Sequence, residues 1–208
     1  MISFFMICVI ITQMKPQAFV FFGIVGSGKG TQVKLLMEYL KSKGGLESVY
    51  AGTGEGFRSL IASGSYTGNL IKDTIARGEL VADFLTDAIF TNILISSLTA
   101  EKNLVADGYP RTVPQSELFE QMMKFFKHDK VSVIYIEVGK EEAMNRNLLR
   151  GRSDDTVQGI AKRFDEYINN VVPAMNYFKN KTGYTIYTIN GEQSIPDVHK
   201  DIIKALGY

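Results

Sequence analysis

The stretch Phe19-Val-Phe-Phe-Gly-Ile-Val-Gly-Ser-Gly-Lys-Gly-Thr31 decides the fold. An apolar run ends at Phe22, glycines punctuate the next residues, and an amphipathic helix is predicted to follow. Glycines here permit a tight turn whose backbone N–H groups converge on phosphate oxygens, and the helix N-terminus adds partial positive charge. Lys29 supplies a point charge, so a glycine-rich turn that binds nothing is the weaker alternative. The stretch therefore predicts a phosphate-binding loop between a strand and a helix.

Strand-like and helix-like segments alternate outward from this loop. The expected strands are 18–22, 48–51, 104–106, 131–138 and 184–189, and the expected helices are 31–43, 57–63, 66–78, 84–99, 113–126, 141–150, 156–180 and 196–206. This rhythm predicts an α/β fold in which the five expected strands form a mostly parallel sheet covered by helices on both faces. Together with the phosphate loop, it indicates a fold of the P-loop NTPase type. Glycines at 52–56 and 64–68 are expected to form turns within an inserted helical region.

Composition excludes several classes of protein. The 208 residues carry 23 Lys+Arg against 22 Asp+Glu, a net charge of +1, which argues against a partner such as nucleic acid or an anionic membrane surface. The single cysteine, Cys8, can form neither an internal disulfide nor a multi-cysteine zinc site. His128 and His199 lie among charged residues and are expected at the surface.

The N-terminus is almost wholly apolar from Met1 to Thr12. About 11 apolar residues are too few to span a bilayer, which needs roughly 20. The segment also lacks the positive region and small-residue cleavage site of a secretory signal. We expect residues 1–16 to be an extension, with Met14 a possible alternative start, and residues 17–208 to form one domain. An extra packed strand or a membrane-associated segment remains open for the extension.

Five separated motifs make the chain resemble the adenylate kinase family of nucleoside monophosphate kinases, from Gln17 to the C-terminus. They are Gly28-Lys-Gly-Thr-Gln32, Thr53-Gly-Glu-Gly-Phe-Arg58, Gly78-Glu-Leu-Val81, Asp107-Gly-Tyr-Pro-Arg111 with Gln115, and Arg152-Ser-Asp-Asp155 with Arg163. The resemblance implies the reaction Mg-ATP + AMP ⇌ 2 ADP, by direct in-line phosphoryl transfer. A UMP/CMP-type kinase and a non-catalytic nucleotide-binding module are the alternatives.

The resemblance also implies a role for each site residue. The ATP side would comprise Gly26, Ser27, Gly28, Lys29, Gly30, Thr31, Arg146, Arg150 and, in the loop 190–194, Gln193. The AMP side would comprise Thr53, Arg58, Glu79, Leu80, Val81, Gly108, Tyr109, Pro110, Arg111, Gln115, Arg152 and Arg163. Catalysis would rest on Lys29, Arg111, Arg150, Arg152 and Arg163.

Arginine usage agrees with these roles. Only seven of the 23 cations are arginines, and five of them match phosphate-binding positions of the family: Arg58, Arg111, Arg150, Arg152 and Arg163. A planar guanidinium can grip phosphate oxygens bidentately, which suits a reaction that brings two phosphorylated substrates together. A solvated surface ion pair is the alternative for any one arginine.

A few positions bear on the metal and the acceptor. Asp107 ends an apolar strand near the phosphate loop and would orient magnesium-bound water, or else cap a loop. No zinc is expected. Thr53 and Gln115 match the family's adenine-recognising positions, since an amide offers both a donor and an acceptor. Glu55, in place of an aspartate, departs from the family pattern.

Two further departures concern ATP. Ile24 and Val25 replace a glycine and a proline of the usual loop. Arg150 and Arg152 are separated by one residue, where most relatives insert a lid, so residues 150–155 are expected to form only a vestigial lid. Because lid closure excludes water, we expect more ATP hydrolysis, or weaker ATP binding, than in lidded relatives. Residues 52–82 would form the helical AMP-binding insertion of the domain. The protein as a whole is expected to be a monomer located in the cytoplasm.

Overall fold

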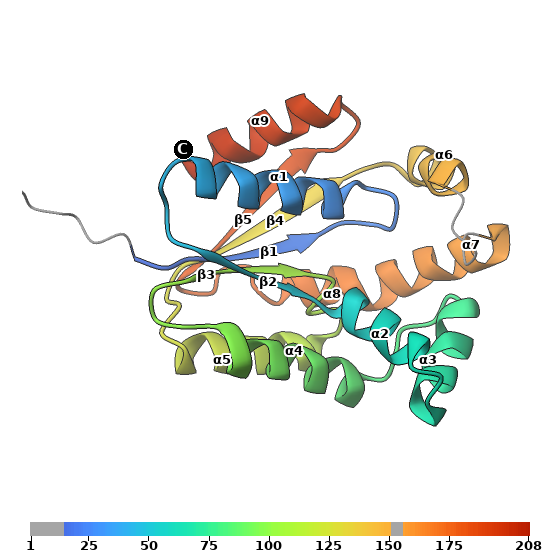
Figure 1. The fold of residues 1–208 in the computed structure, drawn as a ribbon. Coiled ribbons are helices and arrows are strands. Elements are labelled where there is room, and N and C mark those ends of the chain that lie inside the picture. Colours follow the sequence, from blue (N-terminus) through green and yellow to red (C-terminus); the bar gives the residue numbers. More distant parts are fainter. Residues whose placement is uncertain (1–14, 151–155) are drawn as a thin grey trace, which may run out of the picture.

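The computed structural model describes residues 15–150 and 156–208, apart from the side chain of Arg150 (Figure 1). The strands are β1 (Ala18–Phe22), β2 (Ser48–Gly52), β3 (Asn103–Asp107), β4 (Val131–Glu137) and β5 (Tyr184–Asn190). The helices are α1 (Lys29–Ser42), α2 (Thr53–Ala62), α3 (Tyr66–Ala76), α4 (Asp83–Ser97), α5 (Val113–Phe125), α6 (Lys140–Arg150), α7 (Val157–Glu166), the π-helical segment Tyr167–Val171, α8 (Val172–Asn176) and α9 (Ile195–Leu206). Each expected strand is present, and so is each expected helix except the one at 156–180, with ends that differ by a few residues.

The five strands form one parallel sheet in the order β2-β3-β1-β4-β5. β1 is the central strand, and each of its residues Ala18–Phe22 is at most 2% exposed. A strand buried on both faces reads as a continuous apolar run, as this one does. The expected α/β fold with a five-stranded parallel sheet is confirmed.

Helices cover both faces of the sheet (Figure 1). On one face Val20 and Phe22 pack in a core with Phe90 of α4, Phe119 of α5 and Phe178 after α8. On the other face a second core joins Phe19 and Phe21 to side chains of α1, α7 and α9, among them Leu36, Phe164 and Ile202. The two cores fix β1, and with it the start of the phosphate loop, from both sides.

The α2–α3 pair lies beside the carboxyl end of the sheet and has a small core of its own, built on Phe57, Ile71 and Val81. The prediction of a turn at 52–56 is wrong, because α2 begins at Thr53, directly after the extended Gly52. Two glycines lower the helix propensity of this first turn, but burial of Phe57 outweighs that cost. The expected turn at 64–68 is shorter than predicted, since α3 begins at Tyr66 with Ser65 as its N-cap.

The single helix expected over 156–180 is interrupted. α7 ends at Glu166, a π-helical turn spans Tyr167–Val171, and α8 follows with Pro173 near its start. Proline lacks the N–H that a regular helix would donate four residues back, so a wider turn before it accommodates the break.

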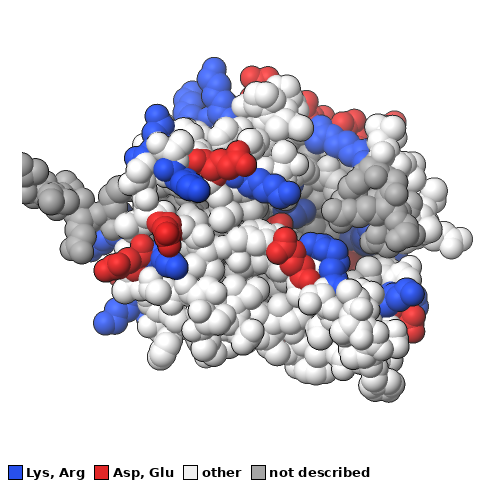
Figure 2. Space-filling model, in the orientation of Figure 1, with Lys and Arg blue, Asp and Glu red and all other residues white. Residues whose placement is uncertain are grey.

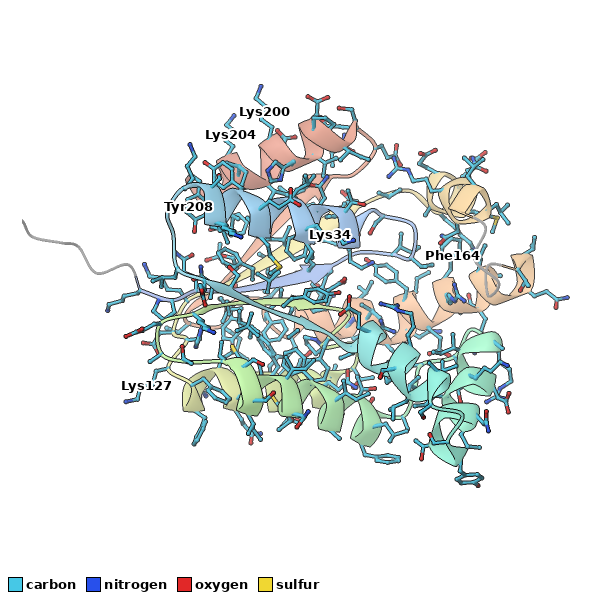
Figure 3. All side chains as sticks on the ribbon, viewed as in Figure 1. Lys34, Lys127, Phe164, Lys200, Lys204 and Tyr208 are labelled. Atoms are coloured by element: carbon cyan, nitrogen blue, oxygen red, sulfur yellow. The ribbon has the colours of Figure 1, made fainter. Side chains whose placement is uncertain are left out.

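Charged side chains of both signs are interspersed over the face in Figure 2. Lys200 and Lys204 project outward from α9, and Lys127 projects outward beyond the end of α5 (Figure 3). In the described residues, none of the helices combines the length and apolar character needed to cross a bilayer.

Candidate functional site

A cavity of about 920 Å³ opens where the carboxyl end of β1 meets the α2–α3 pair and α7. In open α/β sheets ligands bind beyond the carboxyl ends of the strands, so this is the expected place for a substrate. Several residues selected from the sequence line the cavity: Lys29, Arg58, Glu79, Leu80, Val81, Gly108, Pro110, Arg111 and Arg163.

The phosphate loop spans Gly23 to Gly28, between β1 and α1. Gly23, Gly26 and Gly28 have φ of 150°, 88° and 88°, a region that L side chains rarely adopt. A Cβ on Gly23 would lie 2.6 Å from Ser27 Oγ and 2.7 Å from Ile136 O, so the loop also needs glycine there for space. Lys29 Nζ donates to the carbonyl oxygens of Gly23 at 2.5 Å and Ile24 at 3.0 Å. The ammonium group thus lies over its own loop.

Asp107 ends β3 beside the start of α1. Its Oδ2 lies 3.8 Å from the position a Cβ would take on Gly30, so the carboxylate faces the loop–helix junction. Tyr50 Oη, from β2, donates to the same oxygen at 3.4 Å. Burial, followed by repulsion from the Asp107 charge, raises the pKa of the Tyr50 phenol, which therefore stays a protonated donor at neutral pH.

Three arginines face the cavity from different elements. Arg58 comes from α2, Arg111 precedes α5, and Arg163 lies in the last turn of α7. Arg111 Nε donates to Gly108 O at 2.8 Å, which fixes the direction of its guanidinium group. Burial lowers the pKa of Arg111, and the nearby Arg163 charge adds to this while Asp107 opposes it. Two like charges held near one cavity favour an anionic ligand between them.

Thr53, Tyr109 and Gln115 lie behind the cavity wall, with exposures of 0%, 1% and 2%. Gln115 Oε1 accepts from the backbone N–H of Arg111 at 2.8 Å, and Gln115 Nε2 donates to Asp83 Oδ1 at 2.9 Å. These two partners fix which end of the amide carries oxygen, since a carboxylate only accepts and an N–H only donates.

The rest of this network holds the segment 107–112 in place. Thr53 Oγ1 donates to Gly108 O at 3.0 Å, and Thr112 Oγ1 donates to Asp83 Oδ2 at 2.7 Å. Tyr109 Oη donates to Asp87 Oδ1 at 2.8 Å, and burial, followed by that bond, raises the pKa of the Tyr109 phenol.

The opposite wall comes from α3 and the segment after it. Glu79 lines the cavity and pairs with the exposed Arg77 at 2.8 Å, and the hydrogen bond from that guanidinium lowers the pKa of Glu79. Leu80 and Val81 add apolar surface. Lys72 also lines this wall, although its sequence context gave no signal beyond that of a surface lysine.

The residues expected near the ATP base form a separate group that does not line the cavity. Arg146 Nε donates to Glu142 at 2.6 Å and its Nη1 donates to Gly191 O at 3.0 Å. Gln193 Nε2 donates to Asn190 O and to Asp201. Arg146 therefore connects α6 to the loop 190–194 that was expected to contact the base.

Part of the expected site lies outside the residues that the structure describes. Arg152, Asp154 and Asp155 fall in 151–155, and the side chain of Arg150 is not described. In the described ranges, no three His, Cys, Asp or Glu side chains converge as metal ligands.

Sequence reasoning missed Tyr50, Asp83 and Asn147, which position other groups. Asp83 follows the Gly78–Val81 motif and reads simply as an acidic residue in a first helical turn, which the helix dipole favours. Only the fold brings it to Gln115, 32 residues away.

Comparison with known proteins identifies the family. A sequence model described as adenylate kinase matches residues 21–183. An adenylate kinase of Corynebacterium diphtheriae is 34% identical over 188 residues, which cover 90% of this chain and 98% of that protein. One from Bacteroides fragilis is 34% identical over 191 residues, covering 90% and 96%, and one from Thermosipho africanus is 29% identical over 218 residues, covering 90% and 98%. By these matches over most of its length, the chain belongs to the adenylate kinase family.

Proposed function

We propose that this chain transfers the γ-phosphoryl group of Mg-ATP to AMP and forms two molecules of ADP. Membership of the adenylate kinase family supports this activity. The observation that carries the proposal is one cavity faced by two sets of phosphate-binding groups. Lys29 and its glycine loop form one set, and Arg58, Arg111 and Arg163 form the other. A module that only binds ATP needs no second set, so the non-catalytic alternative is not favoured.

The donor phosphates would be held by the segment Gly26–Thr31. Backbone N–H groups at this helix start, with Ser27, Gly28 and Gly30, would surround the β- and γ-phosphates, and Lys29 would follow the transferring group. Arg146 and Gln193 would lie by the adenine of ATP, and Arg150 would contact its phosphates. Arg152 would bridge the two nucleotides at the transferred phosphoryl group.

The acceptor would enter between α2, α3 and the 107–111 segment. Arg58 and Arg111 would bind the AMP phosphate, and Arg163 would bridge to the transferred group. Because Gly108 O fixes the guanidinium of Arg111, that side chain loses little conformational entropy when phosphate arrives. Residues 52–82 would form the acceptor insertion and 150–155 a vestigial lid, within one domain spanning 17–208 that excludes the extension 1–16.

Positioning and electrostatic stabilisation account for the chemistry. The attacking AMP oxygen is already largely anionic near neutral pH, so no side chain need remove a proton. The arginines offset the repulsion between two anionic substrates and hold them in line. Magnesium, when bound with ATP, would neutralise phosphate charge, and the Asp107 carboxylate at the loop–helix junction has the oxygen donor chemistry to orient its water ligands.

Acceptor choice would depend on Thr53 and Gln115, with backbone groups of Glu79, Leu80 and Val81 closing the base pocket and Gly108, Tyr109 and Pro110 supporting it. The orientation of the Gln115 amide favours adenine over guanine and uracil, because one Nε2 hydrogen and an Oε1 lone pair remain to match the N1 and N6–H of adenine, whereas guanine and uracil present the reverse pattern. We further propose that the protein acts as a cytoplasmic monomer without nucleic-acid, membrane or zinc partners.

The experiment is an assay of ADP formation with Mg-ATP and each of AMP, UMP, CMP and GMP. We expect turnover with AMP well above the others, and a fall of at least about 100-fold in kcat/KM for Arg111→Ala, the scale of a lost transition-state contact. Lys200→Ala, on the outer surface of α9, is the matched cation control and should keep wild-type rates (Figure 3). Turnover with UMP but not AMP would contradict the acceptor, and absence of turnover with every acceptor would favour a binding module.

A further inference from the structure

Asn147 of α6 is fully buried, with 0% exposure, although it lines no part of the cavity. Its Nδ2 group donates to Ala143 O at 2.7 Å, four residues earlier in the same helix. The same group donates to Val25 O at 3.0 Å, across 122 residues of sequence. The two hydrogens of one amide group are therefore divided between the helix and the phosphate loop.

On the loop side, backbone atoms make the contact with α6. A Cβ on Gly26 would lie 2.5 Å from Asn147 Nδ2 and 2.5 Å from Ala143 O. Gly26 also has φ of 88°, so glycine is required here both for space and for conformation. The loop is thus pressed against the Asn147 amide group at the point where Val25 joins Gly26.

Holding the Val25 carbonyl fixes the next N–H group as well. The Val25–Gly26 peptide is not among the cis bonds of the described chain. In a planar trans peptide the C=O and the following N–H point in opposite directions. Because Asn147 draws the Val25 carbonyl toward α6, the Gly26 N–H points away from α6.

We propose that Asn147 is a positioning residue for the donor nucleotide, which holds the Val25 carbonyl so that the Gly26 N–H is presented to the ATP phosphates. This inference rests on the proposed function only in taking the loop to bind ATP. Without the Asn147 donor, the Val25 oxygen loses its bond to α6, and the Val25–Gly26 peptide is free to rotate. Loss of the Asn147 amide should weaken the binding of ATP and tripolyphosphate. It should leave AMP binding intact, since Arg58 and Arg111 lie on other elements.

The test compares Asn147→Leu, which keeps the branching of the side chain without a donor, with Asn147→Ala, which removes both. Calorimetry would give the Kd of each variant for ATP, inorganic tripolyphosphate and AMP, and urea denaturation would give its stability. Ser116→Ala is the matched control, because Ser116 is also 0% exposed and bonds a carbonyl of a distant helix, Ala174 O at 3.0 Å.

We expect both Asn147 variants to raise the Kd for ATP and tripolyphosphate about five- to tenfold, the scale of one lost hydrogen bond. The Kd for AMP should stay within about twofold, the scale of a few tenths of a kcal/mol. Ser116→Ala should lose stability with no change in any Kd. An effect only in Asn147→Leu would indicate steric crowding and overturn the proposal, as would equal effects on ATP and AMP. If the wild type binds ATP but forms no ADP from AMP, the proposed function fails while this comparison still decides the role of Asn147.

Discussion

Gly52→Ala should destabilise the protein through one clash, with Tyr50. Gly52 has φ of −105°, so the backbone itself tolerates alanine. The added Cβ would lie 2.3 Å from Tyr50 Oη, 2.4 Å from Cζ and 2.6 Å from Cε1, far inside ordinary contact. The phenol lies over Gly52 to reach Asp107, which pairs with Gly52 across the sheet. Alanine therefore forces the ring aside and breaks its hydrogen bond to Asp107.

The magnitude follows from three effects. Forcing the half-buried Tyr50 ring aside costs about 1–2 kcal/mol, the lower part of the range for overpacking, and the lost hydrogen bond to a carboxylate costs about 1 kcal/mol because it is long. A Gly→Ala change at a compatible φ stabilises the protein by about 0.5 kcal/mol, because alanine lowers the conformational entropy of the unfolded chain. We expect a net loss in the free energy of unfolding of about 2 kcal/mol, within the range of single core substitutions.

A double-mutant cycle measures whether Tyr50 is the cause. Leucine lacks the three ring atoms that clash, so Gly52→Ala in a Tyr50→Leu background should be neutral or stabilising by about 0.5 kcal/mol. Urea denaturation of the four proteins then gives a coupling energy of about 2–3 kcal/mol. If the changes in the free energy of unfolding caused by Gly52→Ala and Tyr50→Leu simply add, within about 0.5 kcal/mol, the clash with Tyr50 is refuted as the cause.

Three other predictions concern pH, acceptor choice and hydrolysis. Hydrogen bonds from Lys181, Tyr177 and Lys124 lower the pKa of Glu120 from 4.5 to about 2, so its stabilising effect is full above pH 4.5 and is lost as pH falls through about 2. After allowance for solvent screening, Glu120→Gln should therefore lower the free energy of unfolding by about 1–2 kcal/mol at pH 6 and by almost nothing at pH 2. Urea denaturation at the two pH values measures this, and equal losses at both would contradict it. Asp83→Ala should lower the ratio of kcat/KM for AMP over GMP about tenfold, since Gln115 keeps its bond from the Arg111 N–H but loses the carboxylate that holds its Nε2 group; an unchanged ratio would rule out that role. Because only six residues separate Arg150 and Val157, ATP hydrolysis without AMP should exceed that of a long-lidded relative assayed beside it, and equal backgrounds would count against the vestigial lid.

The sequence predicted the sheet well because its strands are unambiguous. Ala18–Phe22 is an unbroken apolar run with the phosphate loop directly after it, and its ends are as predicted. Arg58, Arg111 and Arg163 could be selected because each stands in a motif, and the fold places them around one cavity. Their roles toward substrates stay predictions.

Other features depend on contacts that a linear pattern does not contain. His128 was expected at the surface and is 2% exposed, because its ring lies between the carbonyl oxygens of Phe126 and Lys102. Lys102 is 26 residues away, and nothing near His128 in the sequence indicates that partner. Asn147 is similar, since an asparagine among charged helix residues resembles a solvated position until the fold brings Val25 to it.

The carbonyl partners of Lys29 affect how variants at that position can be interpreted. Its ammonium group holds the Gly23 and Ile24 oxygens, so Lys29→Met removes a donor that keeps the loop in shape as well as the charge that we propose meets phosphate. A rate lost in that variant would combine a misshapen resting loop with a missing contact to the nucleotide. Separating the two requires the stability and ATP affinity of the resting variant to be measured before its rate is attributed to chemistry.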